Sequence, residues 1–372
     1  MKRKVLAAAL VTVMMMSLIG CAGSGKEDTA EKTDTGAQSE AGEDEKGEEP
    51  EVKADAGAES GEESEAKELV PISFRLNYTA AGLHAPFYYA LEKGYYREAG
   101  LDVTIGEGTG SGTTAKLVGT GDDELGLVDS ASVASAVANE IPLKIVCPIY
   151  AVNGFAAISM KDSGIEEPKD LEGKKIGITT GDAPSNLFAA LEAANDIDDD
   201  TLNYVTMDAG AKVTSLVNGD VDVILAGADD QAITLQNMGH EVNVMRYSDF
   251  GAATVGLSIV ASDKMIAEHS DVIEKFIAAS MKAWDECRAD SGEAIDIFME
   301  SYPTLDRSNA EGSLGVALES LFAKDSQTLG DVSEDDWKSC RDMLVHYLGV
   351  DESIQPEDIY TYDCLPSELP AK

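Results

Sequence analysis

Positive charge is scarce in this sequence. Its 372 residues contain 28 Lys and Arg against 69 Asp and Glu, which gives a formal net charge of −41. Binding to nucleic acid needs a basic face that neutralises phosphates, and docking on anionic lipid needs a basic cluster as well. The composition therefore argues against both kinds of partner, whereas its 44% of hydrophobic residues suffice for a sizeable core.

Cysteine and histidine are also few. Five Cys do not make a disulfide scaffold, and none of the four His lies at the spacing of a zinc site. No GxSxG nucleophile motif occurs either, so we expect no catalytic residue, no metal and no cofactor. Cys147 lies in a buried strand pattern and is expected to be part of the core. The sequence is compatible either with one disulfide among Cys287, Cys340 and Cys364 or with no disulfide.

Long apolar runs are absent too, because none reaches the roughly 18 to 20 residues of a membrane-spanning helix. The apolar residues 5–20 follow a basic start (residues 2–4) and end before Cys21. This order is typical of a secretory signal, and residues 18–21 (Leu-Ile-Gly-Cys) resemble a bacterial lipobox, where the signal is cut before the Cys and the thiol carries lipid. We predict a signal peptide over residues 1–20 and lipid on Cys21, which places the chain at the extracytoplasmic face of a bacterial cell membrane as a lipid-anchored protein. An ordinary signal peptide that contains a cysteine is the alternative.

Residues 21–68 lack the side chains that build a core. After Cys21 they contain no aromatic residue, no Leu and no Ile, and they carry 5 Lys against 17 Asp and Glu. Such a segment cannot bury enough apolar surface to offset the entropy lost on ordering, and its like charges repel each other. We therefore predict that this segment is a disordered acidic linker between the lipid anchor and the folded part.

From residue 69 onward the sequence alternates between strand and helix patterns. The strands are expected at residues 72–76, 101–105, 125–128, 143–150, 175–178, 202–205 and 221–225. The helices between them are expected at residues 85–99, 113–118, 130–139, 185–194 and 212–217. This alternation is typical of an α/β fold whose mainly parallel sheets are covered by helices on both faces.

The alternating pattern occurs twice. Residues 117–122 and 216–220 each combine a helix end, a glycine cap and an acidic residue before a buried strand. We predict two lobes of like design, the first over residues 69–155 and the second over residues 156–248. Residues 249–372 then return to the first lobe and pack on it as a helical C-terminal tail, with long helices at 270–288, 292–301 and 334–348.

Small and polar residues follow the expected strands. Ligands bind beyond the carboxyl ends of parallel strands, so two lobes whose strand ends face each other form a ligand cleft. The candidate ligand-binding residues are Asn77, Tyr78, His84, Phe87, Gly110, Ser111, Gly112, Asp129, Ser130, Tyr150, Asp182, Ser185, Asp229 and Asp230. The aromatic rings offer stacking surfaces for a flat ligand, and the carboxylates and hydroxyls offer hydrogen bonds.

Several of these candidates have a purely structural alternative. The glycine-rich loop 108–113 lets backbone N–H groups approach a ligand, but it also reads as a flexible turn and lacks the lysine of a phosphate loop. Asp182 fits a helix cap, a lone His84 is more often structural, and Phe87 also suits a core position.

Seven stretches together resemble one family. They are residues 76–78, 84–88, 93–96, 100–103, 108–112, 169–177 and 181–183. The chain resembles, over about residues 70–260, the SsuA/THI5-like (NMT1-type) periplasmic-binding-protein superfamily, which serves ABC importers of nitrate, sulfonates and thiamine-pyrimidine precursors. The resemblance implies a two-lobed, type II-like fold with crossover strands near residues 150–160 and 244–260, and an ABC permease and ATPase as partners. We expect a monomer.

One branch of that superfamily is enzymatic. The eukaryotic thiamine-pyrimidine synthases carry a cofactor-binding Lys and, four residues later, a His, at positions that correspond here to Val128 and Ser132. That chemistry needs an amine and an imidazole, which Val and Ser do not supply. We therefore expect a binding protein, with a synthase-like enzyme as one alternative and a surface adhesion or signalling module that kept the fold as another.

The expected ligand is small, planar and polar. Carboxylates such as Asp129, Asp182 and Asp230 favour a solute with amino donors, such as a thiamine-pyrimidine precursor or a related heterocycle. A nitrate, sulfonate or taurine-type ligand is the alternative that the family keeps open.

Overall fold

The computed structural model describes residues 68–322 and 326–372. The predicted signal peptide, Cys21 and almost all of the predicted linker lie outside these residues. Within them, no helix has both the length and the apolar character that crossing a bilayer requires.

The first sheet has five strands in the order β2-β1-β3-β10-β4. Strand β1 pairs in parallel with β2 and β3, whereas β10 runs antiparallel between β3 and β4. The strands are β1 (Val70–Arg75), β2 (Leu101–Gly106), β3 (Leu125–Asp129), β4 (Leu143–Pro148) and β10 (Leu257–Ser262). Burial follows position, because the central β3 is buried at every residue while the edge strand β2 alternates between buried and exposed residues at its start.

The second sheet repeats this arrangement in the order β7-β6-β8-β5-β9. Strand β6 pairs in parallel with β7 and β8, and β5 runs antiparallel between β8 and β9. The strands are β5 (Phe155–Met160), β6 (Lys175–Ile178), β7 (Asn203–Thr206), β8 (Val223–Gly227) and β9 (Val242–Arg246). The chain therefore passes between the sheets twice, from β4 to β5 and from β9 to β10, and the predicted pair of crossovers is confirmed. We call each sheet with its flanking helices a lobe.

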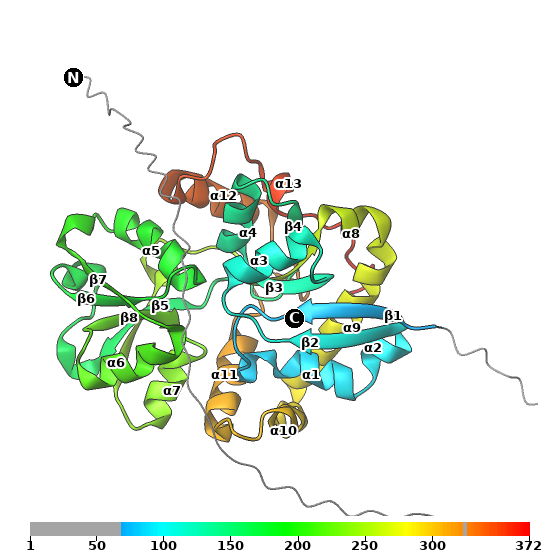
Figure 1. Ribbon diagram of the computed structural model, residues 1–372, viewed down its shortest axis with the longest axis horizontal. Coiled ribbons are helices and arrows are strands. Elements are labelled where there is room, and N and C mark those ends of the chain that lie inside the picture. The colour runs from blue at the N-terminus through cyan, green and yellow to red at the C-terminus, as the bar shows by residue number, and fades with distance from the viewer. Residues whose placement is uncertain (1–67, 323–325) are drawn as a thin grey trace, which may run out of the picture. The chain divides into compact units, whose positions relative to one another are not determined.

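Helices flank both sheets. The first lobe contains η1 (Gly82–His84), α1 (Ala85–Glu92), α2 (Tyr95–Glu98), α3 (Ser111–Thr120) and α4 (Ser130–Ala138). The second contains η2 (Lys161–Ser163), η3 (Pro168–Leu171), α5 (Ala183–Ala194), η4 (Asp199–Thr201), η5 (Ala209–Ala211), α6 (Lys212–Asn218), α7 (Gln231–Asn237) and η6 (Tyr247–Phe250). In Figure 1, α5 lies on one side of the second sheet and α6 and α7 on the other.

The predicted helix over residues 85–99 is wrong as a single element. It breaks into α1 and α2 at Gly94, whose φ of 77° is left-handed. A residue without Cβ adopts this conformation at little cost and ends the first helix.

The C-terminal helices do not all pack on one lobe. They are α8 (Asp263–Glu268), α9 (Ser270–Ala289), α10 (Gly292–Ser301), α11 (Arg307–Glu319), α12 (Glu334–Leu348) and α13 (Pro356–Ile359). Helices α9 and α10 contact α1, as expected, but α11 contacts both η1 and α7, and α12 contacts both α4 and α5. The expectation of a tail on the first lobe alone is therefore corrected, because α11 and α12 bridge the two lobes.

Phe87 belongs to the first-lobe core. Its side chain is fully buried, and its ring lies 4.9 Å from that of Phe74 and 5.8 Å from that of Trp284, measured between centroids. The prediction that Phe87 binds ligand is therefore wrong. Among the described residues the cysteines are all buried, and none forms a disulfide.

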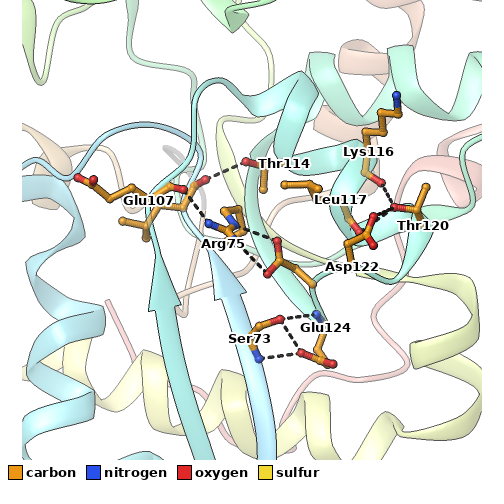
Figure 2. A network of polar contacts seen from close by, with 11 residues as sticks. Ser73, Arg75, Glu107, Thr114, Lys116, Leu117, Thr120, Asp122 and Glu124 are labelled. Atoms are coloured by element: carbon orange, nitrogen blue, oxygen red, sulfur yellow. Dashed lines mark hydrogen bonds and ion pairs between the residues drawn. The ribbon is translucent and has the colours of Figure 1, made fainter. Parts of the chain in front are cut away.

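A polar network joins the ends of three strands in the first lobe (Figure 2). The Arg75 guanidinium pairs with the buried Asp123 carboxylate before β3, at 2.8 Å from Nε, and donates to the backbone oxygen of Glu107 after β2, at 3.0 Å. The Thr114 hydroxyl on α3 donates to the backbone oxygen of Leu76, at 2.8 Å. These contacts fix the loops after β1 and β2, which carry several of the predicted site residues.

Candidate functional site

A pocket lies between the lobes, at the carboxyl ends of their parallel strands. The first lobe and the start of the crossover after β4 supply Asn77, Tyr78, Thr79, Ala81, Leu83, His84, Gly110, Ser111, Asp129, Tyr150 and Leu257. The second lobe and the crossover before it supply Gly154, Phe155, Asp182, Ala183, Pro184, Lys212, Ala226, Gly227, Asp229, Asp230 and Gln231. This is the location at which parallel α/β sheets bind ligands.

The structure brings most of the predicted residues together here, but not Phe87, Gly112, Ser130 or Ser185. Ser130 is fully buried, and its hydroxyl donates to the backbone oxygen of Val255. The Ser185 hydroxyl accepts from the Thr179 N–H at 3.2 Å, inside the turn that starts α5. Neither serine lines the pocket, because the Ser130 hydroxyl is bound to the backbone of a distant segment and the Ser185 hydroxyl lies within the turn before α5.

His84 and Asn77 form a neutral, oriented pair. Burial lowers the pKa of His84 to about 3, so the imidazole is uncharged at neutral pH. Its Nδ1 accepts from the Ala81 N–H at 3.1 Å, which leaves the proton on Nε2, and Nε2 lies 2.8 Å from Asn77 Oδ1. The Asn77 amide nitrogen then remains a donor without a partner among the described residues. His84 thus orients a hydrogen-bond donor of the pocket.

Asp129 lines the pocket and has one unpaired carboxylate oxygen. It ends β3 and caps α4, because its Oδ1 accepts from the Ala131 N–H at 2.9 Å. Its Oδ2 is buried and has no hydrogen-bond partner among the described residues. Burial raises the pKa of Asp129 to about 7. A buried oxygen without a partner is unfavourable, so this atom favours a ligand that donates a hydrogen.

Asp182 and Lys212 form a buried ion pair on the second lobe. One Asp182 oxygen caps α5 by accepting from the Ser185 N–H at 3.0 Å, and the other pairs with Lys212 Nζ. Lys212 Nζ also donates to the backbone oxygen of Leu225 at 2.6 Å. The sequence analysis missed Lys212, because a lysine at the start of a polar helix gives no sign of burial.

Asp229 and Asp230 follow β8. Burial raises the pKa of each carboxyl to about 6, and in Asp230 the neighbouring Asp229 adds to the effect. The Tyr150 hydroxyl donates to Asp229 at 3.3 Å, and the Gln231 amide donates to Asp230. Among the described lining residues, four carboxylates thus accompany one lysine, which is already paired. The pocket favours a neutral or cationic ligand with N–H donors over an anion.

The remaining walls suit a flat ring. Tyr78, Phe155, Pro184 and Leu257 present apolar surface to the pocket. Burial, helped by Asp182 and Asp230, raises the pKa of Tyr78 to about 12, so its hydroxyl keeps its proton.

The two positions that the resemblance compares with the synthases lie away from the pocket. Val128 and Ser132 are buried, and neither lines the pocket. In the part of the chain that the structure describes, no group of three or more His, Cys, Asp or Glu side chains is arranged to hold a metal ion. What the pocket offers is an aromatic surface with oriented donors and acceptors.

Two mixed sheets of like order, joined by two crossovers and flanked by helices, define a periplasmic-binding-protein fold. Residues 82–294 match the model of the family described as NMT1/THI5 like. The chain belongs to this family.

Relatives within reach of sequence comparison include both binding proteins and synthases. The formylaminopyrimidine-binding protein of Halalkalibacterium halodurans is 22% identical over 82% of this chain and 94% of its own length. The riboflavin-binding protein RibY of Chloroflexus aurantiacus is 26% identical over 63% of this chain and 67% of its own. The 4-amino-5-hydroxymethyl-2-methylpyrimidine phosphate synthase of Aspergillus parasiticus is 25% identical over 63% of this chain and 71% of its own length.

Solved structures agree on the fold. The aliphatic sulphonate binding protein SsuA of Escherichia coli superposes with a TM-score of 0.63 at 14% identity, covering 81% of this chain and 95% of that one. The nitrate-binding protein NrtA of Synechocystis PCC 6803 superposes with a TM-score of 0.61 at 13% identity, covering 80% of this chain and 88% of that one. At such identities the likeness shows the fold and not the ligand.

Proposed function

We propose that this chain is the lipid-anchored, extracytoplasmic solute-binding component of an ABC importer. In this proposal its pocket captures a small planar heterocycle with amino or ring N–H groups, the best candidate being a thiamine-pyrimidine precursor or a related ring. Solute enters between open lobes, the lobes rotate about the two crossovers, and the closed form delivers the solute to the permease and ATPase. The solute leaves unchanged.

The unpaired oxygen of Asp129 is the observation that carries this proposal. Asp129 lines the pocket and this oxygen is buried, so in this proposal a ligand N–H donates to it. A nitrate or sulfonate would need donors and positive charge, yet Lys212 is already held by Asp182 and Leu225. The carboxylates at positions 129, 229 and 230 would repel such an anion.

An enzymatic role has less support. The synthases among the relatives are 24–25% identical to this chain, but Val128 and Ser132 stand where the resemblance places their Lys and His. Neither side chain reaches the pocket, so neither offers a nucleophile or a base to a bound molecule.

Calorimetric titration of the purified chain tests the proposal. We expect 4-amino-5-hydroxymethyl-2-methylpyrimidine or cytosine to bind, and taurine and nitrate to give no heat. Binding of taurine or nitrate without either aminopyrimidine would overturn the ligand class. An adhesion module would respond to none of the four, and turnover of a bound pyrimidine would show an enzyme.

A further inference from the structure

A second cavity opens beside the pocket. It shares Tyr78, Thr79, Asp230 and Gln231 with the pocket, so these side chains line both cavities and the two adjoin. Both lobes contribute to it. Its own lining is marked by hydroxyls and one further carboxylate, from Thr109, Thr179, Thr234 and Asp208. We call it the outer cavity.

The hydroxyls of the outer cavity are available to a ligand. Those of Thr79, Thr109 and Thr234 have no hydrogen-bond partner among the described residues. The Thr179 hydroxyl donates to the backbone oxygen of Met207 at 3.1 Å, which leaves its lone pairs free to accept. A hydroxyl both donates and accepts, so this lining matches a chain of alcohols.

The charge of the outer cavity disfavours a ligand that carries a phosphate group there. Neither Lys nor Arg is among its described lining residues, whereas Asp208 and Asp230 are. A phosphate at this place would meet like charge without a cation to offset it. A neutral hydroxylated tail meets no such repulsion.

Resting on the proposed function, we propose that the ligand has two parts. A flat ring occupies the inner pocket, and an uncharged, hydroxylated chain or sugar lies in the outer cavity among its threonines. The solute class is therefore an unphosphorylated nucleoside-like or ribityl-bearing heterocycle, bound more tightly than its bare ring and more tightly than its phosphate ester.

Two matched ligand series test this proposal on the purified chain. One is cytosine, cytidine and cytidine 5′-monophosphate; the other is lumichrome, riboflavin and riboflavin 5′-phosphate. In the series that binds, we expect the hydroxylated member to bind about tenfold more tightly than the bare ring, as for one or two added hydrogen bonds. The phosphate should return the affinity to that of the ring or below. Equal affinity of ring and hydroxylated member, or tightest binding of the phosphate, would overturn the outer-cavity assignment.

Variants of the outer cavity test whether its threonines bind the hydroxylated part of the ligand. The double variant Thr109→Val/Thr234→Val should remove most of the advantage of the hydroxylated member and leave the affinity for the bare ring unchanged. Thr104→Val, on the exposed side of β2, is the matched control and should change neither. Asp208→Asn should raise the affinity for the phosphate member several-fold. If the advantage survives in the double variant, the tail lies elsewhere and the proposal fails.

The failures of the two proposals are distinguishable. If the bare rings bind and the hydroxylated chain or sugar does not increase their affinity, the solute-binding function stands and the outer cavity is not a subsite. If no member of either series binds but 4-amino-5-hydroxymethyl-2-methylpyrimidine does, this inference falls and the proposed function stands. If that pyrimidine fails as well, the proposed class of heterocyclic ligand falls with it.

Discussion

Asp129 uses its two carboxylate oxygens differently, which makes the Asp129→Asn variant informative. Asn is as good a helix cap as Asp, so its side-chain oxygen keeps the bond to the Ala131 N–H at the start of α4. The other oxygen is replaced by an amide nitrogen that cannot accept from a ligand N–H. At pH 8, where the carboxyl is ionised, we expect affinity for the aminopyrimidine that binds to fall by about 10- to 100-fold, as for a hydrogen bond to a charged group, measured by titration calorimetry.

The matched control for this variant is Asp306→Asn. Asp306 caps α11 in the same way, by accepting from the Asn309 N–H, and does not line the pocket. It should leave the affinity unchanged. Equal affinities of wild type and Asp129→Asn would remove Asp129 from ligand recognition.

The raised pKa of Asp129 also predicts how stability depends on pH. Between an unfolded pKa of about 3.9 and the folded pKa of about 7, the native carboxyl holds a proton that the unfolded chain has released. This contribution to stability is therefore present at low pH and is lost as pH rises towards 7. His84, with its pKa lowered to about 3, gives the opposite slope below pH 6.5, so the comparison must be made against Asp129→Asn.

We expect the unfolding free energy of the ligand-free wild type, relative to Asp129→Asn, to fall by about 3 kcal/mol between pH 4.5 and pH 8. Denaturant titration at several pH values measures it, with His84 unchanged in both proteins. A difference that stays constant over this range would show that Asp129 is ionised throughout.

Single residues also show where sequence reasoning stops. Asn77, Asp129 and Asp229 were predicted as site residues because they lie at or just beyond strand ends, and strand order alone brings such positions together. Phe87 and Lys212 were misjudged for one physical reason. Burial of a side chain depends on neighbours distant in sequence, such as Trp284 for Phe87 and Asp182 for Lys212.

Helix α11 links the lobes through a close approach at Gly312. A Cβ on Gly312 would lie 2.5 Å from Ile233 Cγ2 on α7, and Asn237 on α7 donates to Asn309 on α11 at 2.8 Å. Since α11 also packs on η1 of the first lobe, Gly312→Ala should push the lobes apart at this rim. We expect the affinity for the bound aminopyrimidine to fall several-fold, because the closed form becomes less populated.

Gly315→Ala is a control in the same helix. Gly315 has no atom near its missing Cβ, so the change should stabilise α11 by about 0.5–1 kcal/mol and leave affinity unchanged. Thermal unfolding and titration calorimetry measure the two effects. If Gly312→Ala behaves like Gly315→Ala in both, the contact between α7 and α11 does not control closure.

The elements that the sequence analysis missed have weak local patterns. Helix α11 was not predicted, because its two glycines and small residues interrupt the apolar periodicity. Gly94 was read through as helix, because the apolar residues on both sides of it continue a helical pattern. The strands of both sheets were easier to predict, since most are short apolar runs bounded by glycine or acidic residues.

At the scale of the whole molecule, the repeat of strands and helices predicted two lobes, and two sheets of like order confirm the fold class. The sequence did not reveal that α11 and α12 would contact both lobes. Which lobe a helix covers is decided by the shape of the assembled surface, and a helical pattern carries no information about that surface. The predicted membrane anchor, in contrast, rests on a purely local sequence pattern and can be tested by itself.

We predict that Cys21→Ser releases the chain from the membrane. The thiol is the atom to which lipid is joined in the lipoprotein reading of residues 18–21, and a serine hydroxyl does not replace it. The variant should lose incorporation of labelled palmitate and move from the membrane fraction to the soluble extracytoplasmic fraction, whereas Ser24→Ala should keep both properties. The affinity for solute should be the same in all three proteins, because the pocket is built wholly from residues 77–257. A wild-type chain that incorporates no label would replace the lipoprotein by an ordinary secreted protein, and the importer proposal would then need another means of holding the chain near its permease. Label retained by Cys21→Ser would place the lipid on another residue and overturn the assignment to Cys21.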